Sequence, residues 1–323
     1  MPAMPHMQRE YQTPSAIDLE EVPCMVCSSG DAIVREPALR DYEYGVPGLF
    51  TLRECRACGQ HYLSPRPKEK DLPQCYPLDY HGYQTRAISR LYDFLTAAQM
   101  HRRFARYHRL LGTKANVLDV GCGDGYVLKE LKKRAPEWQL YGVEFKEEIA
   151  RSGQEQGFTI CYGTLEECAF SGVAFDLLIM NHLIEHLPDP LRTLKKAQEM
   201  LKPGGYIIGE VPNYDSWDRR VASQYWGGHH TPRHLFQFTP KTLAALFTRA
   251  GLSTVRISPE LHTGHWAGSV QNFLQNTPLK TTLRNGRAPY YPLLLALFVP
   301  INILQALLGK TGIMSFIAKK PLS

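Results

Sequence analysis

Four cysteines near the N-terminus have the spacing of a metal site. They form two Cys-x-x-Cys pairs, Cys24 with Cys27 and Cys55 with Cys58, within a stretch rich in Pro, Gly and Tyr. Four thiolates favour a tetrahedral, closed, structural zinc site, and the alternative is that the cysteines coincide in a strand-rich cap. The sequence therefore predicts a zinc-binding module over residues 21–85, stabilised by metal more than by a large core.

A glycine-rich loop is the second candidate for chemistry. Residues 119–125 read Asp-Val-Gly-Cys-Gly-Asp-Gly and follow an apolar run, and a helix is expected after them. Glycines allow a tight turn and a close approach of a ligand to the backbone, while the helix start presents N–H groups. Glu144 ends the next expected strand, where it can reach two ribose hydroxyls. This order of elements predicts a cofactor-binding unit.

Two cofactors compete for that unit. A dinucleotide fingerprint needs Gly-x-Gly-x-x-Gly, and Tyr126 stands where its third glycine should be. Carboxylates at Asp119 and Asp124 would disfavour a pyrophosphate, whereas a cofactor that carries an ammonium and a sulfonium tolerates them. A glycine turn without a ligand is the remaining alternative. The pattern favours S-adenosylmethionine as the cofactor.

The string His182-Leu-Ile-Glu185-His186 is the third candidate, at the point where the fourth strand is expected to open into a helix. At spacings i, i+3 and i+4 these side chains share one helical face. The string also matches an inverted zinc-protease motif. That motif requires a helix in a protease fold, whereas this string follows a cofactor-binding sheet, so we reject the protease interpretation. Three interpretations stay open: a structural cap, a histidine base for an acceptor hydroxyl, or a divalent-metal site.

More histidines gather in the segment from Trp226 to Phe236, which is expected to lie over the carboxyl ends of the strands. His229, His230 and His234 are candidate bases alongside His182, although one or two of them are expected to bond to backbone instead. Methyl transfer from a sulfonium is downhill, so alignment of the acceptor carries much of the rate. The identity of the acceptor is not encoded in these residues.

Alternating strand and helix patterns from residue 116 onward must position these groups. They predict an α/β fold, a doubly wound and mostly parallel sheet of seven strands in a Rossmann-like arrangement. The strands are expected at Val117–Val120, Gln139–Glu144, Thr159–Tyr162, Phe175–Asn181, Gly205–Val211, Ser253–Ser258 and Met314–Lys319. The helices are expected at Tyr126–Arg134, Lys146–Gln156, Pro190–Leu201 and Pro240–Ala250.

The chain as a whole divides into six predicted segments: a leader over 1–20, the zinc module over 21–85, a basic linker helix over 86–112, a core over 113–260, an apolar insertion over 261–312 and a last strand over 313–323. The N-terminus lacks the apolar region of a secretory signal, which predicts a cytoplasmic protein. Disulfides are not expected in a reducing compartment. The remaining cysteines, Cys75, Cys122, Cys161 and Cys168, are interpreted as packing residues.

The apolar insertion includes an uncharged run over 289–308 that has about the length of a membrane span. A single crossing would place the last strand on the wrong side of the bilayer, and Pro292 and Pro300 interrupt the helix. We expect a helical pair lying in the membrane interface or an apolar lid, and the alternative is that the stretch packs against the protein or a dimer mate. Flanking Lys and Arg favour a peripheral position on the inner face of the membrane.

Several of these motifs together resemble the class I S-adenosylmethionine-dependent methyltransferases, and most of all the branch of the ubiquinone-biosynthesis O-methyltransferases. They are Val117–Gly125, Gly142–Glu144, Phe175–Ile179, Glu185–Pro190 and Leu201–Gly205. The resemblance implies that the glycine loop holds the methionine part, that Glu144 binds the ribose, and that Phe145 and the segment after the third strand lie near the adenine. The implied cofactor residues are Asp119, Gly121, Cys122, Gly123, Gly125, Glu144, Phe145, Gly163, Thr164, Leu165 and Asn181.

The cysteine pairs resemble the N-terminal zinc region of certain sugar C-methyltransferases. Three functions follow as hypotheses: O-methylation of a lipophilic or glycan-type small molecule, C-methylation of a nucleotide sugar, and RNA binding or modification by a zinc ribbon. The net charge of +6 is a mild excess, and the sequence lacks aromatic-basic interleaving, so we do not expect a nucleic-acid partner. The oligomeric state stays open.

Overall fold

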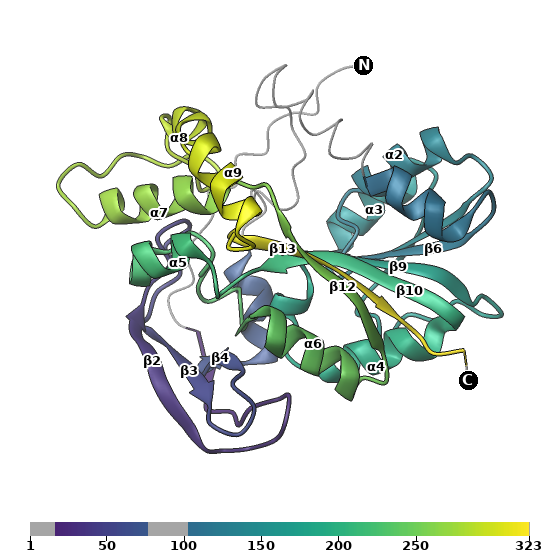
Figure 1. Cartoon of the computed structure of the whole chain (residues 1–323), viewed down its shortest axis with the longest axis horizontal. Coiled ribbons are helices and arrows are strands. Elements are labelled where there is room, and N and C mark those ends of the chain that lie inside the picture. Colours follow the sequence, from purple (N-terminus) through teal and green to yellow (C-terminus); the bar gives the residue numbers. More distant parts are fainter. Residues whose placement is uncertain (1–16, 77–102, 323) are drawn as a thin grey trace.

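The structure, a computed structural model, describes residues 17–76 and 103–322 of the 323-residue chain. Figure 1 shows a twisted central sheet, with the N-terminal strands below it and the helices that precede the last strand above it. The predictions for residues 1–16 of the leader, residues 77–85 of the zinc module and residues 86–102 of the basic helix lie outside the described residues. Residues 103–111, the end of that helix, are helical.

The central sheet has seven strands in the order β12-β13-β10-β9-β6-β7-β8. Their bounds are β6 Asn116–Val120, β7 Gln139–Glu144, β8 Thr159–Tyr162, β9 Phe175–Asn181, β10 Leu201–Pro212, β12 Ser253–Glu260 and β13 Ile313–Lys319. Strand β13 runs antiparallel to both of its neighbours, while the β10-β9-β6-β7-β8 pairs are parallel. The predicted fold class is therefore confirmed, with β10 starting earlier and β12 ending later than expected.

Helices cover both faces of this sheet. Their bounds are α2 Tyr126–Arg134, α3 Glu147–Glu155, α4 Pro190–Met200 and α6 Pro240–Arg249. Successive residues of a strand point to opposite faces: in β9, Leu178 packs in the core that includes Leu194 of α4, whereas Leu177 packs in the core that includes Leu131 of α2 and Trp138. Parallel strands buried on both faces place all their carboxyl ends at one edge, where the site lies.

The chain leaves β9 differently from the prediction. His182 has a left-handed backbone with φ of 48°, and Ile184–His186 is a single 3-10 turn, η3. The regular helix α4 begins only at Pro190, where the side chain of Asp189 accepts a hydrogen bond from the amide of Arg192 at 3.0 Å. The expected α-helical face that His182 shares with Glu185 and His186 is therefore wrong in its geometry.

The N-terminal region forms a four-stranded antiparallel sheet in the order β11-β4-β3-β2. The strands are β2 Ala32–Leu39, β3 Phe50–Cys55, β4 His61–Leu63 and β11 Phe236–Gln237. A small pair joins β1 Leu19–Glu20 to β5 Arg66–Pro67, and the 3-10 helix η1 Glu69–Cys75 follows. Because β11 comes from the histidine-rich loop of the core, the two regions share one sheet.

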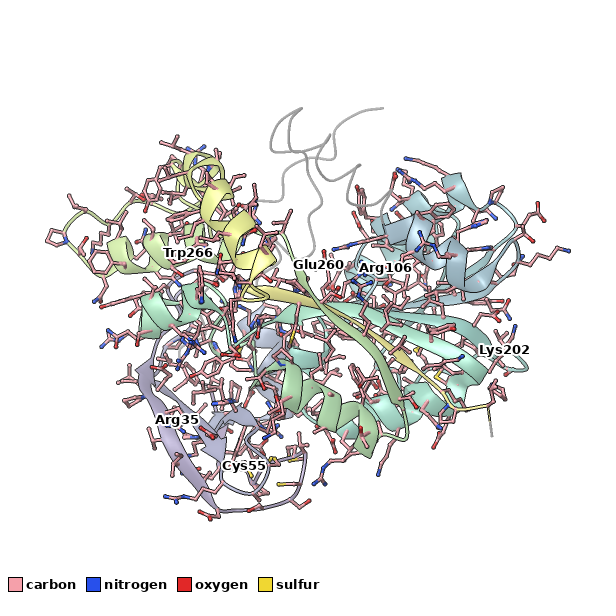
Figure 2. All side chains as sticks on the ribbon, viewed as in Figure 1. Arg35, Cys55, Arg106, Lys202, Glu260 and Trp266 are labelled. Carbon is pink, nitrogen blue, oxygen red and sulfur yellow. A yellow bond between two sulfur atoms is a disulfide. The ribbon has the colours of Figure 1, made fainter. Side chains whose placement is uncertain are left out.

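The segment between the core and β13 is helical, as expected. It follows the short elements α5 Trp217–Ala222 and η4 Ser223–Tyr225, and contains α7 Gly264–Gln275, α8 Tyr291–Leu297 and α9 Val299–Leu307. Figure 2 labels Trp266 on α7, whose indole nitrogen donates to Gln305 Oε1 of α9 at 2.8 Å. Within residues 17–76 and 103–322, no helix has the length and apolar character needed to cross a membrane.

Two cysteines require a correction. Cys161 on β8 and Cys168 form a disulfide, with Cα atoms 6.0 Å apart, and are not the separate packing residues that we expected. The turn over residues 163–167 brings the chain back beside β8, which places the two thiols within bonding reach. The expectation that disulfides are absent is therefore wrong for this pair. Cys75 and Cys122 are buried and unpaired, in agreement with a packing role.

Candidate active site

The glycine loop after β6 folds back on the end of β7. The amide of Gly121 donates to the carbonyl oxygen of Val143 at 2.8 Å, and the amide of Gly123 donates to Glu144 Oε2 at 3.0 Å. Gly121, Gly123 and Gly125 have φ values of 74°, 56° and 82°, which residues with a side chain rarely adopt. The loop therefore requires its glycines and leaves its backbone accessible to a ligand.

Two buried carboxylates flank this loop, and they give it negative character. Asp119 and Glu144 are only 3 % and 2 % exposed. Burial raises the pKa of Asp119 to about 7, the nearby charge of Glu144 adds to the rise, and Arg103 opposes it. Burial likewise raises the pKa of Glu144. A ligand that brings positive charge would stabilise both carboxylates, which fits an ammonium and a sulfonium and disfavours a pyrophosphate.

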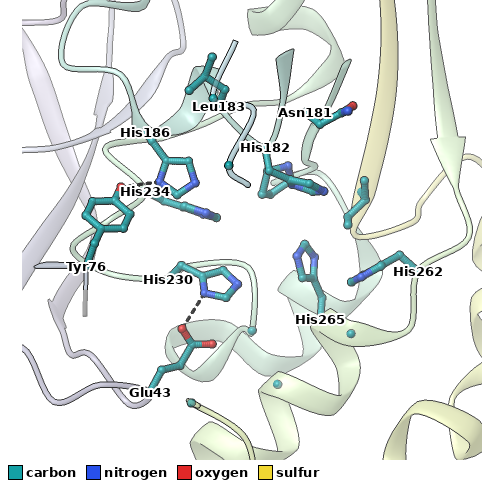
Figure 3. Close-up of a pocket in the computed structure, with 18 of the residues that line it drawn as sticks. Glu43, Tyr76, Asn181, His182, Leu183, His186, His230, His234, His262 and His265 are labelled. Carbon is teal, nitrogen blue, oxygen red and sulfur yellow. Dashed lines mark hydrogen bonds and ion pairs between the residues drawn. The ribbon is translucent and has the colours of Figure 1, made fainter. Parts of the chain in front are cut away.

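A pocket of about 400 Å³ opens beside the loop. Gly121, Gly123, Glu144, Phe145 and Asn181 line one end of it. Six histidines line the remainder, and Figure 3 shows them around a common space: His182, His186, His230, His234, His262 and His265. The structure therefore brings five of the eleven predicted cofactor residues and most of the predicted histidines into one cavity.

His182 lines the pocket and faces two carboxylates. Its Nδ1 is 3.5 Å from Glu185 Oε1 and its Nε2 is 3.8 Å from Glu210 Oε2. Glu185 is fully buried, and among the described residues neither of its carboxylate oxygens has a partner with hydrogen-bond geometry. Burial acts to lower the pKa of His182, but the contact with Glu185 and the charge of Glu210 outweigh it, so the pKa of His182 is raised.

The other histidines near Glu185 are held neutral. Burial lowers the pKa of His186 to about 4 and lowers that of His234 well below its ordinary value. His186 Nδ1 lies 2.8 Å from the hydroxyl of Tyr76, and His234 Nδ1 lies 2.9 Å from the carbonyl oxygen of Gly228. Side-chain atoms of Glu185, His186 and His234 all lie within 4.8 Å of one another. This cluster has the composition of a divalent-metal site, so that interpretation stays open beside the structural and catalytic ones.

His230 reaches the pocket from the opposite side, again from a left-handed backbone with φ of 39°. Its Nδ1 lies 2.8 Å from Glu43 Oε2, and Figure 3 marks this pair with a dashed line. Arg233, which is fully buried, donates to both carboxylate oxygens of Asp41 at 2.8 and 3.0 Å and to Glu43 at 3.0 Å. Acidic residues of the N-terminal region therefore orient the histidine loop.

The backbone of Leu235 connects the same loop to both regions. Its amide donates to the carbonyl oxygen of Glu185 at 2.8 Å, and its own carbonyl accepts from the amide of Leu63 on β4 at 2.9 Å. The guanidinium of Arg66 adds a second bridge, since it donates to the carbonyl of Pro188 at 2.6 Å. The position of Glu185 therefore depends on the strands of the N-terminal region.

Some predicted site residues lie outside the pocket. His229 is 4 % exposed, its Nε2 lies 3.1 Å from the carbonyl of Ser223, and burial lowers its pKa to about 3, so it is held away from the cavity. Gly163 bonds to the backbone of Glu144, and Leu165 is part of the core. The residues of the predicted set that do not line the pocket are Asp119, Cys122, Gly125, Gly163, Thr164, Leu165, Glu185 and His229.

Sequence reasoning missed several residues that line the pocket. Glu43 and Tyr76 come from the N-terminal region, and His262, His265 and Tyr291 come from the apolar insertion. Burial lowers the pKa of His262 to about 4 and that of His265 well below its ordinary value. Their side chains converge only through tertiary contacts. The one available signal was the presence of two further histidines three residues apart at the start of the insertion.

The four predicted zinc ligands do come together. Cys24 Sγ lies 3.6 Å from Cys58 Sγ and Cys27 Sγ lies 3.4 Å from Cys55 Sγ, and all four sulfur atoms lie within 4.8 Å of one another. A tetrahedral site with Zn–S bonds of about 2.3 Å has edges of roughly 3.8 Å. Figure 2 labels Cys55 in this cluster, which lies in the N-terminal region away from the pocket. The geometry fits a structural ion.

Comparisons with known proteins identify the family of the chain. A family described as "Methyltransferase domain" matches residues 89–257, which is just over half of the chain. A stretch of 151 residues is 30 % identical to the ubiquinone biosynthesis O-methyltransferase of Cereibacter sphaeroides, covering 43 % of this chain and 60 % of that enzyme. A trans-aconitate 2-methyltransferase of Deinococcus radiodurans is 33 % identical over 113 residues, covering 34 % of this chain and 43 % of that protein.

The match therefore spans well under two thirds of the length of these curated relatives. Among solved structures, a SAM-dependent methyltransferase from Archaeoglobus fulgidus has a TM-score of 0.45 and 21 % identity, covering 71 % of this chain and all of that one. The family match and the glycine loop beside buried carboxylates lead to one conclusion. This chain belongs to the methyltransferase family, as an S-adenosylmethionine-dependent enzyme of class I.

Proposed function

We propose that this enzyme methylates a hydroxyl oxygen of a lipophilic or glycan-type small molecule. One observation carries the proposal: a single cavity contains the glycine loop with Glu144 at one end and His182, beside buried Glu185, at the other. S-adenosylmethionine, when bound, supplies an electrophilic methyl group on sulfur. The residues of this chain then need to align the acceptor oxygen and remove its proton.

The donor end is proposed to bind the cofactor through its carboxylates and glycines. Glu144 accepts from the backbone amides of Gly123 and Lys146 at 3.0 Å each, so its position is set before ribose hydroxyls donate to its remaining lone pairs. Asp119 supplies negative charge behind the loop. Phe145 and Asn181 line the same end, where an apolar ring and an amide suit the adenine and the amino-acid part of the cofactor.

His182 is the proposed general base. Oε2 of Glu210 is already engaged by the guanidinium of Arg103, so Nε2 is the ring nitrogen assigned to the acceptor proton. With S-adenosylmethionine bound, its methyl group would be available to the acceptor oxygen, and Nε2 of His182 would take the hydroxyl proton. Glu185 faces Nδ1 and stabilises the imidazolium that forms, which makes it a positioning residue.

The acceptor end favours an apolar molecule with one or two polar groups. Its wall includes Leu183, Pro212, Leu295 and Ile313, and the buried histidines with lowered pKa are neutral, so the cavity offers a substrate mainly apolar contacts with a few polar groups, Arg287 among them. We place the reaction in the cytoplasm, at the inner face of a membrane. That environment supplies lipophilic alcohols and phenols.

We propose that the cysteine cluster holds one structural Zn²⁺ through Cys24, Cys27, Cys55 and Cys58. The ion would tie the turn between β3 and β4 to the turn before β2, and so fix the sheet that positions Glu43 and the β11 edge. Replacing Cys24 and Cys27 by Ser is expected to abolish zinc in the purified protein and to lower its thermal stability. Unchanged zinc content and stability would contradict this assignment.

The central test separates cofactor binding from proton removal. Calorimetry with S-adenosylmethionine should detect binding to the wild-type chain, and extracts incubated with methyl-labelled cofactor should yield a labelled lipophilic product. His182→Ala should bind the cofactor normally and lose most of the transfer. A product whose label resists ether cleavage would indicate carbon methylation instead, and absence of cofactor binding would overturn the function itself.

A further inference from the structure

The helix pair α8–α9 exposes apolar side chains, and α9 buries polar ones. On α9 the polar residues Asn302 and Gln305 are only 2 % and 0 % exposed. Asn302 Oδ1 accepts from the amide of His262 at 2.8 Å, and Gln305 donates to Asp218 Oδ1 at 2.9 Å. The apolar side chains instead face outward: Leu293, Leu297, Val299, Ile301, Ile303, Leu304, Leu307 and Leu308, with exposures from 36 % to 79 %.

This outer face combines exposed apolar side chains with an absence of charge. Residues 288–309 contain no Asp, Glu, Lys or Arg. Soluble proteins normally turn such a face inward, and a contiguous exposed apolar patch marks a contact with a membrane or another protein. The inward hydrogen bonds of Asn302 and Gln305 hold the pair in this orientation, because rotating α9 would break them and take a hydrogen bond from the buried carboxylate of Asp218. The exposure is therefore built into the fold.

The charge around the face selects among partners. Within residues 261–309, the stretch that contains this face, there is no acidic residue, while Lys280, Arg284 and Arg287 are present. Lys280 and Arg284 are exposed on the loop that leads into α8. A second copy of this chain would bring the same positive charge to the contact and repel it. An anionic lipid surface offers the opposite charge together with an apolar layer.

The same helices border the active-site pocket. Tyr291 and Leu295 of α8 line the cavity, while Leu293 and Leu297 of the same helix point outward. Arg287, just before α8, also lines the pocket and lies over the ring of Tyr291 at 5.3 Å. One short helix therefore separates the outer apolar face from the space in which the acceptor would lie.

We propose that α8 and α9 form an interfacial anchor that lies in the headgroup layer of an anionic bilayer and places the pocket beside it. The lipid role of this surface stands independently of catalysis, whereas delivery of the acceptor from the bilayer rests on the proposed function. The helices have seven and nine residues, so they lie in one leaflet and do not span it. Lipid-dissolved acceptors then enter past α8 without crossing water.

Flotation of the full chain with vesicles tests the anchor. Vesicles of phosphatidylcholine with about a third phosphatidylglycerol should bind the protein, and pure phosphatidylcholine should bind it more weakly. The double variant Leu293→Glu with Leu307→Glu should lose at least about 100-fold in affinity. The double variant Lys280→Gln with Arg284→Gln should lose about fivefold in vesicle affinity for each charge removed. Its vesicle binding should also depend less on salt concentration than that of the wild-type chain.

Matched controls keep the test decisive. Leu49→Glu with Leu322→Glu changes two exposed leucines elsewhere and should leave vesicle binding intact, and calorimetry with S-adenosylmethionine reports whether each variant is folded. Equal vesicle binding by the wild-type chain and the Leu293/Leu307 variant, or a dimer that only the Leu293/Leu307 variant disrupts, overturns the anchor. Those results would not affect the proposed methyl transfer. Absence of S-adenosylmethionine binding by the wild-type chain would instead overturn the proposed function and leave the anchor unaffected.

Discussion

The two ends of the pocket are built in different ways. The donor half, around Gly121, Gly123, Glu144 and Phe145, comes from the ends of two adjacent parallel strands only about two dozen residues apart in the chain. The acceptor half takes Glu43 and Tyr76 from the N-terminal region, the histidines from the loop before β11, and Tyr291 from α8. The first is a local motif, and the second is an assembly of distant segments.

The donor half can be shared with other proteins that bind the same cofactor, whereas the acceptor half is particular to this chain. The donor half needs only a strand, a glycine turn and an acid, so it can recur on many sequences that use the same cofactor. The acceptor half depends on contacts such as those of Arg233 with Asp41 and of Leu235 with Leu63, which link regions more than 100 residues apart. Changes in one half should therefore leave the other half working.

The largest expected effect is on the chemical step. His182→Ala should lower kcat by about 10²- to 10⁴-fold, because the acceptor proton loses its base, while the affinity for S-adenosylmethionine stays close to that of the wild type. Steady-state kinetics and calorimetry measure the two quantities. His262→Asn is the matched control: this histidine lines the pocket without a carboxylate contact in the described structure, and its loss should cost much less in kcat. Comparable losses in both variants would contradict the assignment.

A second prediction tests the assembly of the acceptor half. Arg233→Met should reduce the free energy of unfolding by about 3–5 kcal/mol, because the buried carboxylate of Asp41 loses the cation that faces it. Urea denaturation followed by tryptophan fluorescence provides the measurement. Arg35→Met removes an ion pair with Glu54 that is largely at the surface, so it should change stability by less than about 1 kcal/mol. Equal stability of the two variants would argue against the buried network.

The donor half has its own, smaller test. Glu144→Gln should weaken S-adenosylmethionine binding by about 10- to 100-fold, since the charged acceptor for the ribose hydroxyls is lost. Glu147→Gln changes an exposed acid three residues later, which is bonded to Arg151 on the surface, and should have no effect. Calorimetry reports both affinities. If binding of a lipophilic acceptor also fails in Glu144→Gln, the two halves are not independent.

The smallest effect concerns pH. The base must be unprotonated, so kcat should fall as pH drops through the raised pKa of His182. Glu185→Gln removes the charge that favours the imidazolium, so the pKa falls and the acidic limb of the pH profile moves to lower pH. A variant that merely destabilised the fold would lose activity at every pH. An unchanged limb would remove Glu185 from the positioning role.

Sequence reasoning worked where local patterns decide the structure. The strand and helix periods predicted the sheet, and the glycine loop with Glu144 predicted the donor end, because these features depend on residues close together in the chain. The cysteine spacing likewise predicted the cluster of four thiols. The contact between Glu43 and His230 could not be predicted from the sequence. The two residues lie in loops far apart in the chain, and neither loop carries a local pattern that indicates the other as its neighbour.

Two further differences arose from tertiary context. His229 and His230 are adjacent in sequence and looked equivalent, but the backbone turns one toward Ser223 and the other, with φ of 39°, toward Glu43. The positions of Asn302 and Gln305 within an otherwise apolar run do not by themselves show which face of α9 is buried. Their inward hydrogen bonds instead direct the leucines outward, which no periodicity score could reveal.

The two-residue strand β11 has a practical consequence for protein engineering. It pairs Phe236 with Tyr62 and Gln237 with His61, so the loop that carries His230 and His234 ends inside the sheet of the cysteine-rich region. A chimera that exchanges this region for that of another methyltransferase must therefore carry residues 226–238 with it. A chimera that exchanges the cysteine-rich region without residues 226–238 should still bind its cofactor. It should lose the geometry that selects the acceptor.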